Sequence, residues 1–142
     1  MKNVGSYFEY EEARNADLLR AFKQQLEGNK GYPVSRIYKI IVEMPSKRFW
    51  VSEERAAIVM SYMIRGVETG IRSALKKEMY EEIYARLCKA REQNPNESIY
   101  NLTFDIVNGP APKFYLTPDS AKVIIGKINR KWYEERKHKR LL

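Results

Sequence analysis

Residues 45–60 read PSKRFWVSEERAAIVM, and residues 110–125 read PAPKFYLTPDSAKVII. Both segments contain a proline, a basic residue, two aromatic residues, an aliphatic residue, a hydroxyl residue and an acidic residue, followed by an apolar-rich run. The two segments begin 65 positions apart. At the same spacing, identical residues occur in the pairs Ile41/Ile106, Val42/Val107, Phe49/Phe114, Ala56/Ala121 and Arg65/Arg130. The repeated segment predicts that one structural unit occurs twice in the chain.

Apolar side chains recur at steps of three and four residues in six segments, which is the periodicity of amphipathic helices. The predicted helices span residues 7–27, 35–43, 52–66, 75–93, 98–108 and 117–140. Hydroxyl side chains that can accept a hydrogen bond from the first turn stand at four of the starts, namely Ser35, Ser52, Ser98 and Thr117. No segment shows a convincing strand pattern, so we predict an all-α fold of six helices.

These helices form two tandem three-helix units, at about residues 7–66 and 75–140, which an internal duplication would relate. A unit of this size buries little apolar surface alone, so we expect both units to pack about a pseudo-twofold axis in a single compact domain over residues 1–142. The alternative is chance similarity between two amphipathic stretches. Each unit is helix-turn-helix-like, although the connector from Pro45 to Val51 is about twice the usual length of the turn.

Large aromatic residues are usually buried, so Phe49 and Phe114 are predicted to lie in the core. Cys88 and Trp132 fall on the apolar stripes of their helices and are predicted to face inward. For Trp50 and Tyr115, core and surface positions remain equally open.

The chain carries a formal charge of +8 and a pI near 9.5. A basic protein of this kind favours an anionic partner, with nucleic acid first and an acidic protein or a membrane surface second, although a soluble basic domain without such a partner has the same composition. No stretch approaches 18 uninterrupted apolar residues, so we expect no membrane span. The single cysteine and the absence of an apolar leader at the N-terminus favour a cytoplasmic protein.

Two basic elements are candidates for nucleic-acid contact. In each connector a cation precedes aromatic residues at a helix N-terminus, an arrangement that can bind phosphate and stack on a base. The last helix carries a dense run of cations that can neutralise a phosphate backbone, or that can serve only as a solvated tail. The candidate contacts are Lys47, Arg48, Trp50, Lys113, Tyr115, Lys127, Arg130, Lys131, Arg136 and Lys137.

Signals of catalysis are weak in this sequence. It contains no zinc motif of clustered cysteine and histidine residues and no glycine-rich phosphate loop. The single histidine, His138, lies in a basic run and is predicted to be solvated. We therefore expect no catalytic residues, no metal and no cofactor.

The leading hypothesis is a nucleic-acid-binding protein, with DNA preferred over RNA, acting as a small regulator or accessory factor. The alternative is a non-enzymatic helical adaptor that docks an acidic protein through an exposed aromatic patch at Trp50 or Tyr115. An enzyme of unknown type is the third hypothesis.

Overall fold

The computed structural model describes residues 4–141, with side chains described from Tyr10 to Arg140. Over this range the chain forms six α-helices and no β-strand, which confirms the predicted all-α fold. The helices are α1 (Val4–Gly28), α2 (Val34–Val42), α3 (Glu53–Arg65), α4 (Ala74–Gln93), α5 (Ile99–Val107) and α6 (Pro118–Leu141). None of these helices is long and apolar enough to cross a membrane.

Three of the four predicted N-caps are present. The hydroxyl oxygens of Ser52, Ser98 and Thr117 each accept a hydrogen bond at 3.1 Å from the backbone N–H three residues later. The prediction for Ser35 is wrong, because α2 starts one residue earlier, directly after Pro33, and has no side-chain cap. Proline already fixes the backbone in a conformation that can enter a helix, so this start does not depend on a hydroxyl cap.

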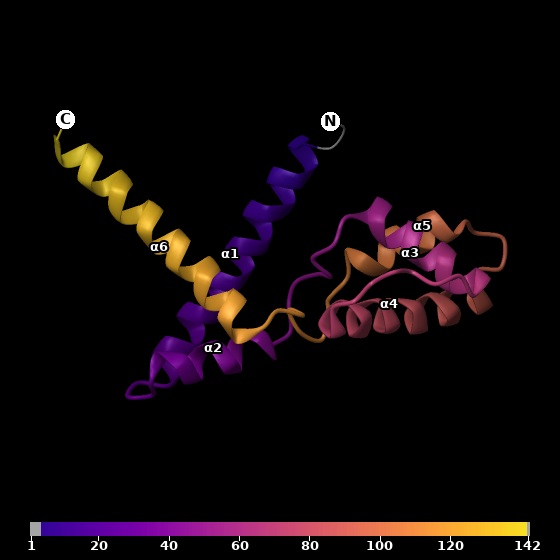
Figure 1. Cartoon of the computed structure of the whole chain (residues 1–142), viewed down its shortest axis with the longest axis horizontal. Helices are drawn as coiled ribbons and strands as arrows, with labels where there is room; N and C mark the ends of the chain where they lie inside the picture. The colour runs from indigo at the N-terminus through magenta and orange to yellow at the C-terminus, as the bar shows by residue number, and fades with distance from the viewer. Residues whose placement is uncertain (1–3, 142) are drawn as a thin grey trace.

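The helices pack in two groups of three (Figure 1). We call α1, α2 and α6 the first lobe, and α3, α4 and α5 the second lobe. Each lobe contains its own hydrophobic core. In the described part of the chain, no helix of one lobe packs against a helix of the other. The two lobes are therefore joined through the connectors that run between them.

Each lobe combines two helices of one sequence repeat with the third helix of the other. The helix α3, from the first repeat, packs on α4 and α5, whereas α6, from the second repeat, packs on α1 and α2. The sequence units at residues 7–66 and 75–140 thus do not coincide with the lobes. We call this arrangement the exchange of third helices, because each sequence repeat places its third helix in the lobe that contains the other two helices of the other repeat. Duplication as the origin of the repeat remains a hypothesis.

Two connectors, residues 43–52 and 108–117, carry out this exchange by crossing each other. The backbone of Phe49 donates to the carbonyl oxygen of Val107 at 3.0 Å, and the backbone of Phe114 donates to that of Val42 at 3.2 Å. Phe49 and Phe114 are 65 positions apart, and so are Val42 and Val107, so the two hydrogen bonds join equivalent pairs of residues. The connectors are therefore related locally by a pseudo-twofold axis.

The predicted burial of Phe49 and Phe114 is confirmed, and the two rings lie in opposite lobes: Phe49 in the core of the second and Phe114 in that of the first. The inward predictions for Cys88 and Trp132 are wrong. Cys88 is exposed because the buried stripe of α4 passes through its neighbour Leu87 instead. Trp132 is 49% exposed because it lies beyond Ile128, the last residue of α6 that packs against the core of the first lobe.

Candidate nucleic-acid interface

Arg48, a predicted phosphate contact in the first connector, is engaged within the protein. Its guanidinium donates to the carbonyl oxygens of Phe49 and Val51 at 3.0 and 2.7 Å. It also donates to the Asn108 side chain at 2.9 Å and forms an ion pair with Glu53 at 3.4 Å. Only 18% of the side chain is exposed. Arg48 thus holds the first connector against the end of α5.

The same arrangement favours the ionised form of Glu53 at the start of α3. Burial alone would raise the pKa of this carboxyl group. Hydrogen bonds from its own backbone N–H, from Asn108 and from Arg48, together with the charge of Arg48, outweigh burial and lower the pKa below its usual value. The negative charge also lies at the positive end of the α3 dipole, which stabilises it further.

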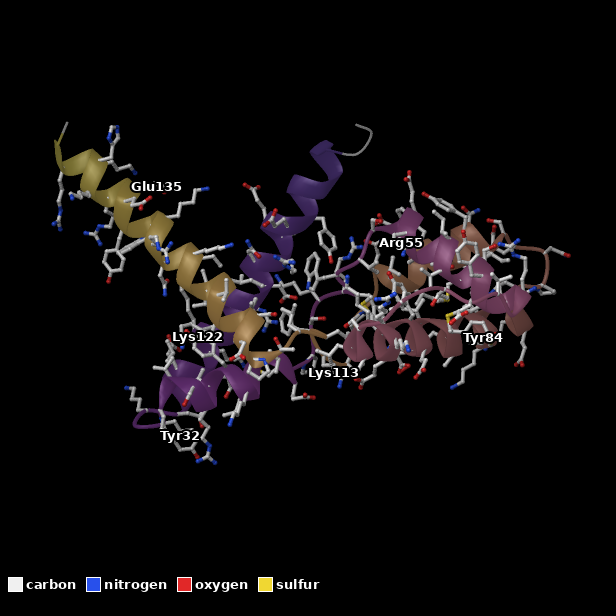
Figure 2. The ribbon with its side chains drawn as sticks, in the orientation of Figure 1. Tyr32, Arg55, Tyr84, Lys113, Lys122 and Glu135 are labelled. Atoms are coloured by element: carbon white, nitrogen blue, oxygen red, sulfur yellow. The ribbon has the colours of Figure 1, made fainter. Side chains whose placement is uncertain are left out.

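Lys113 occupies the equivalent position in the second connector and is also paired. Its ammonium group lies 2.6 Å from a carboxylate oxygen of Glu78 and 3.8 Å from one of Glu43. The hydrogen bond to Glu78 is the main reason that the pKa of Lys113 is raised. Figure 2 shows Lys113 at the junction between the lobes. Arg48 and Lys113 therefore cannot pair with an external phosphate without giving up an internal partner.

Two connector aromatics were predicted to contact nucleic acid; of these, Tyr115 is buried and Trp50 is half-buried. The Tyr115 ring stacks on the Phe49 ring at a centroid distance of 6.0 Å. One face of the Tyr115 ring is therefore covered by the core. Its backbone has a positive φ of 56°, a conformation that non-glycine residues adopt uncommonly. These contacts place Tyr115 in the core, where its ring is not presented to a base.

Trp50 and Lys47 are tied to Asp17, a buried carboxylate on α1. One Asp17 oxygen accepts from the indole Nε1 of Trp50 at 3.1 Å and from the backbone N–H of Lys47 at 2.8 Å. The other oxygen accepts from Arg20 at 2.7 Å. The Lys47 side chain is exposed, but its backbone helps to fasten the first connector to α1.

Asp17 is the residue that sequence reasoning missed as a structural anchor. It falls within the apolar stripe of α1, next to the buried Leu18. An acid at an inward position of a helix is the signal that could have identified it, because buried carboxylates need hydrogen-bond donors. The identity of those donors, 30 and 33 positions away, has no local signature.

The remaining predicted contacts lie on α6 and are exposed. Figure 1 shows that α6 diverges from α1 and projects away from the body of the first lobe. All side chains described from residue 129 to residue 140 are exposed. Arg136 lies 4.7 Å above the ring of Trp132, on the helix surface. The exposed cations of α6 are Lys122, Lys127, Arg130, Lys131, Arg136, Lys137, Lys139 and Arg140.

Positive charge is distributed unevenly between the lobes. Residues 53–112, which contain the second lobe, have 8 lysine and arginine residues against 9 acidic residues. The rest of the chain has 18 lysine and arginine residues against 9 acidic ones. The whole positive excess therefore resides outside the second lobe, and its densest part is α6.

A groove of about 890 Å³ lies between the lobes and is bordered by both connectors. Aromatic side chains from both lobes, including Tyr10, Trp50 and Tyr80, line it. Its charged side chains are of both signs, with Arg14, Arg48, Arg55 and Lys76 beside Glu53 and Glu54. Mixed charge of this kind does not select one class of ligand. Among the residues that the structure describes, no group of three or more histidine, cysteine or acidic side chains could hold a metal ion.

Comparison of the chain with protein-family models, with curated proteins and with solved structures gave no match.

Proposed function

We propose that this protein binds nucleic acid, with duplex DNA preferred, as a small non-enzymatic regulator or accessory factor. The observation that supports the proposal is the segregation of charge: a neutral to slightly acidic second lobe is joined to a first lobe whose projecting helix carries eight exposed cations. A polyanion with regularly spaced phosphates matches such a helix, and release of its counterions drives association.

The arrangement narrows the set of contacts expected from the sequence. We keep five cations as proposed phosphate contacts, because their side chains are exposed on α6: Lys127, Arg130, Lys131, Arg136 and Lys137. Arg48 and Lys113 hold the connectors in place through internal partners. In this proposal the crossing connectors set the direction of α6, and α6 makes the contacts.

The test is a salt titration of binding to a labelled duplex, followed by fluorescence anisotropy. If about five phosphates are contacted, log affinity against log salt should have a slope of roughly −4 to −5. Replacing Lys127, Arg130 and Lys131 together with glutamine should reduce the magnitude of this slope by about 3. A matched control replaces three exposed cations of the second lobe, Arg72, Lys77 and Lys89, and should leave the slope unchanged. Absence of binding at about 50 mM salt would exclude the proposal.

A second candidate, a protein adaptor, is favoured by one feature of the second lobe. Its surface exposes Ile58 on α3, and Tyr100 and Phe104 on α5, with the last two rings 6.4 Å apart. Exposed apolar side chains in a lobe with little net charge suit a protein partner better than a polyanion. If this candidate is correct, replacing Tyr100 and Phe104 with serine should abolish copurification of a protein partner. The variant with glutamine at Lys127, Arg130 and Lys131 should still copurify with that partner.

A further inference from the structure

Gly126 lies within α6, eight residues after Pro118, where the helix begins, and its position is exposed. A Cβ atom added there would meet nothing within 4 Å, and Gly126 is not among the glycines with a positive φ. Glycine inside a helix is less favourable than alanine, because it loses more backbone freedom on folding. Neither packing nor backbone conformation within the described residues therefore requires a glycine at this position.

The side chains one turn to either side of Gly126 form a single exposed helix face. Lys122, Val123, Lys127 and Arg130 are one, three or four positions from it, and all are exposed. With Asp119 they line a shallow hollow that includes Gly126. None of these cations forms an ion pair with another described residue. The face thus has no side chain at the glycine, and its edges carry three cations without an ion pair together with the carboxylate of Asp119 (Figure 2, where Lys122 is labelled).

The face around Gly126 is on the solvent side of the part of α6 that packs on the first lobe through Ala121 and Ile125, and the helix continues beyond it. Beyond Ile128, twelve described residues are exposed, and at 1.5 Å per residue they extend about 18 Å from the lobe. The major groove of B-DNA is about 12 Å wide, which admits an α-helix, whereas the minor groove is about half as wide. A missing side chain lets the helix backbone approach the base edges while the flanking cations reach the phosphates on both sides.

We propose that α6 lies in the major groove of duplex DNA with the face around Gly126 directed toward the bases. This inference rests on the proposed function and adds to it the element, the groove and the residue that sets the distance of approach. Lys122, Lys127 and Arg130 are the side chains that border the groove floor. The occupant follows from charge complementarity, since a duplex offers phosphates along both edges of the groove and none at its floor.

The experiment compares Gly126→Gln with Gly28→Gln in binding to a labelled DNA duplex. Gly28 lies in the same lobe, and a Cβ there also meets nothing within 4 Å, so the two substitutions are matched. Circular dichroism of both variants checks that the helices are retained. Gly126→Gln should lower DNA affinity at least tenfold, with the salt slope kept, because the phosphate contacts remain. Gly28→Gln should bind as wild type does.

A second measurement replaces the DNA duplex with an RNA duplex of the same sequence. The major groove of A-form RNA is deep and narrow, so binding should weaken at least tenfold. Equal affinity for both duplexes would overturn the major-groove assignment. So would DNA binding that Gly126→Gln leaves unchanged, or a change in self-association of that variant without loss of DNA affinity. Each of these outcomes would contradict the major-groove proposal and leave the proposed DNA binding intact. If the wild-type protein binds no duplex at all, both the major-groove proposal and the proposed function are wrong.

Discussion

Ser46 and Ala111 donate backbone hydrogen bonds to each other's carbonyl oxygen, at 3.1 Å in both directions. They are 65 positions apart, so the local pseudo-twofold axis passes between them. The buried hydroxyl of Ser46 donates at 2.7 Å to the carbonyl oxygen of Arg48 and lies 3.3 Å from that of Lys113. This one pair therefore joins the two connectors at the point where the chain exchanges its third helices.

The substitutions Phe49→Ala and Phe114→Ala should each lower the free energy of unfolding by about 3–5 kcal/mol, because each removes a large buried aromatic ring. The two rings lie in different cores, so the double variant should lose approximately the sum of both values. Urea denaturation measures these energies, with Tyr133→Ala at an exposed position as the control. A melting curve like that of the wild type for Phe114→Ala would contradict the burial of the ring.

Removal of the Asp17 carboxylate should loosen the attachment of the first connector to α1. Asp17→Ala leaves two donors without an acceptor, the Lys47 backbone and the Trp50 indole, and should cost about 3–5 kcal/mol. Arg20→Gln should cost less than Asp17→Ala, because that arginine is 39% exposed and the Lys47 backbone and the Trp50 indole still donate to the carboxylate that remains.

The urea denaturation of these two variants can be followed through Trp50 alone if Trp132 is replaced with phenylalanine, since the chain contains two tryptophans. Equal costs for Asp17→Ala and Arg20→Gln would show that the salt bridge matters more than the bonds to the connector.

Alkaline pH should destabilise the fold through Tyr115. Burial, with smaller contributions from Glu82 and Glu78, raises the pKa of its hydroxyl from 10.0 to about 12. The folded state holds this proton more tightly than the unfolded state, so the contribution is complete below about pH 10 and is lost as the pH rises toward 12. Tyr115→Phe should lose less stability over that interval in thermal melts. Tyr133→Phe should behave as the wild type, since the ring is exposed.

The exchange of third helices predicts that two halves of the chain complement each other. A cut in the segment 66–73, which has no helix and contains Gly66 and Gly70, separates α1–α3 from α4–α6 without interrupting an element. The first half lacks α6, which completes the first lobe, and the second half lacks α3, which completes the second lobe. Mixed halves should copurify with the helix content of the intact chain, and each half alone should self-associate or unfold. Monomeric, folded single halves would contradict the exchange.

Much of the local structure could be predicted from the sequence. Helical periodicity and the hydroxyl caps at Ser52, Ser98 and Thr117 depend on neighbouring residues, so the six helices were predicted within three residues. Trp132 was misplaced because periodicity identifies the apolar side of a helix without showing whether a partner covers it.

The pairing of helices, in contrast, was not accessible from the sequence. It depends on the path of the connectors, and hydrogen bonds such as that from Phe49 to Val107 join residues 58 positions apart. The same reason explains why the internal partners of the connector side chains were not predicted. Lys113 looked like a free cation in the sequence, but its partner Glu78 is on another helix and 35 positions away. Cations on α6 kept their predicted exposure because no remote element reaches them.

The exchanged third helices also set the order in which the lobes can be completed during synthesis. The helices of the second lobe are contiguous, from Glu53 to Val107, so their core can begin to form as soon as that stretch has left the ribosome. The first lobe starts earlier but must wait for Phe114, Ala121 and Ile125 from the far end of the chain. Its closure spans a much longer loop and is therefore the slower, later event. A chain that ends before α6 is made would present a finished second lobe beside an open apolar surface on α1 and α2.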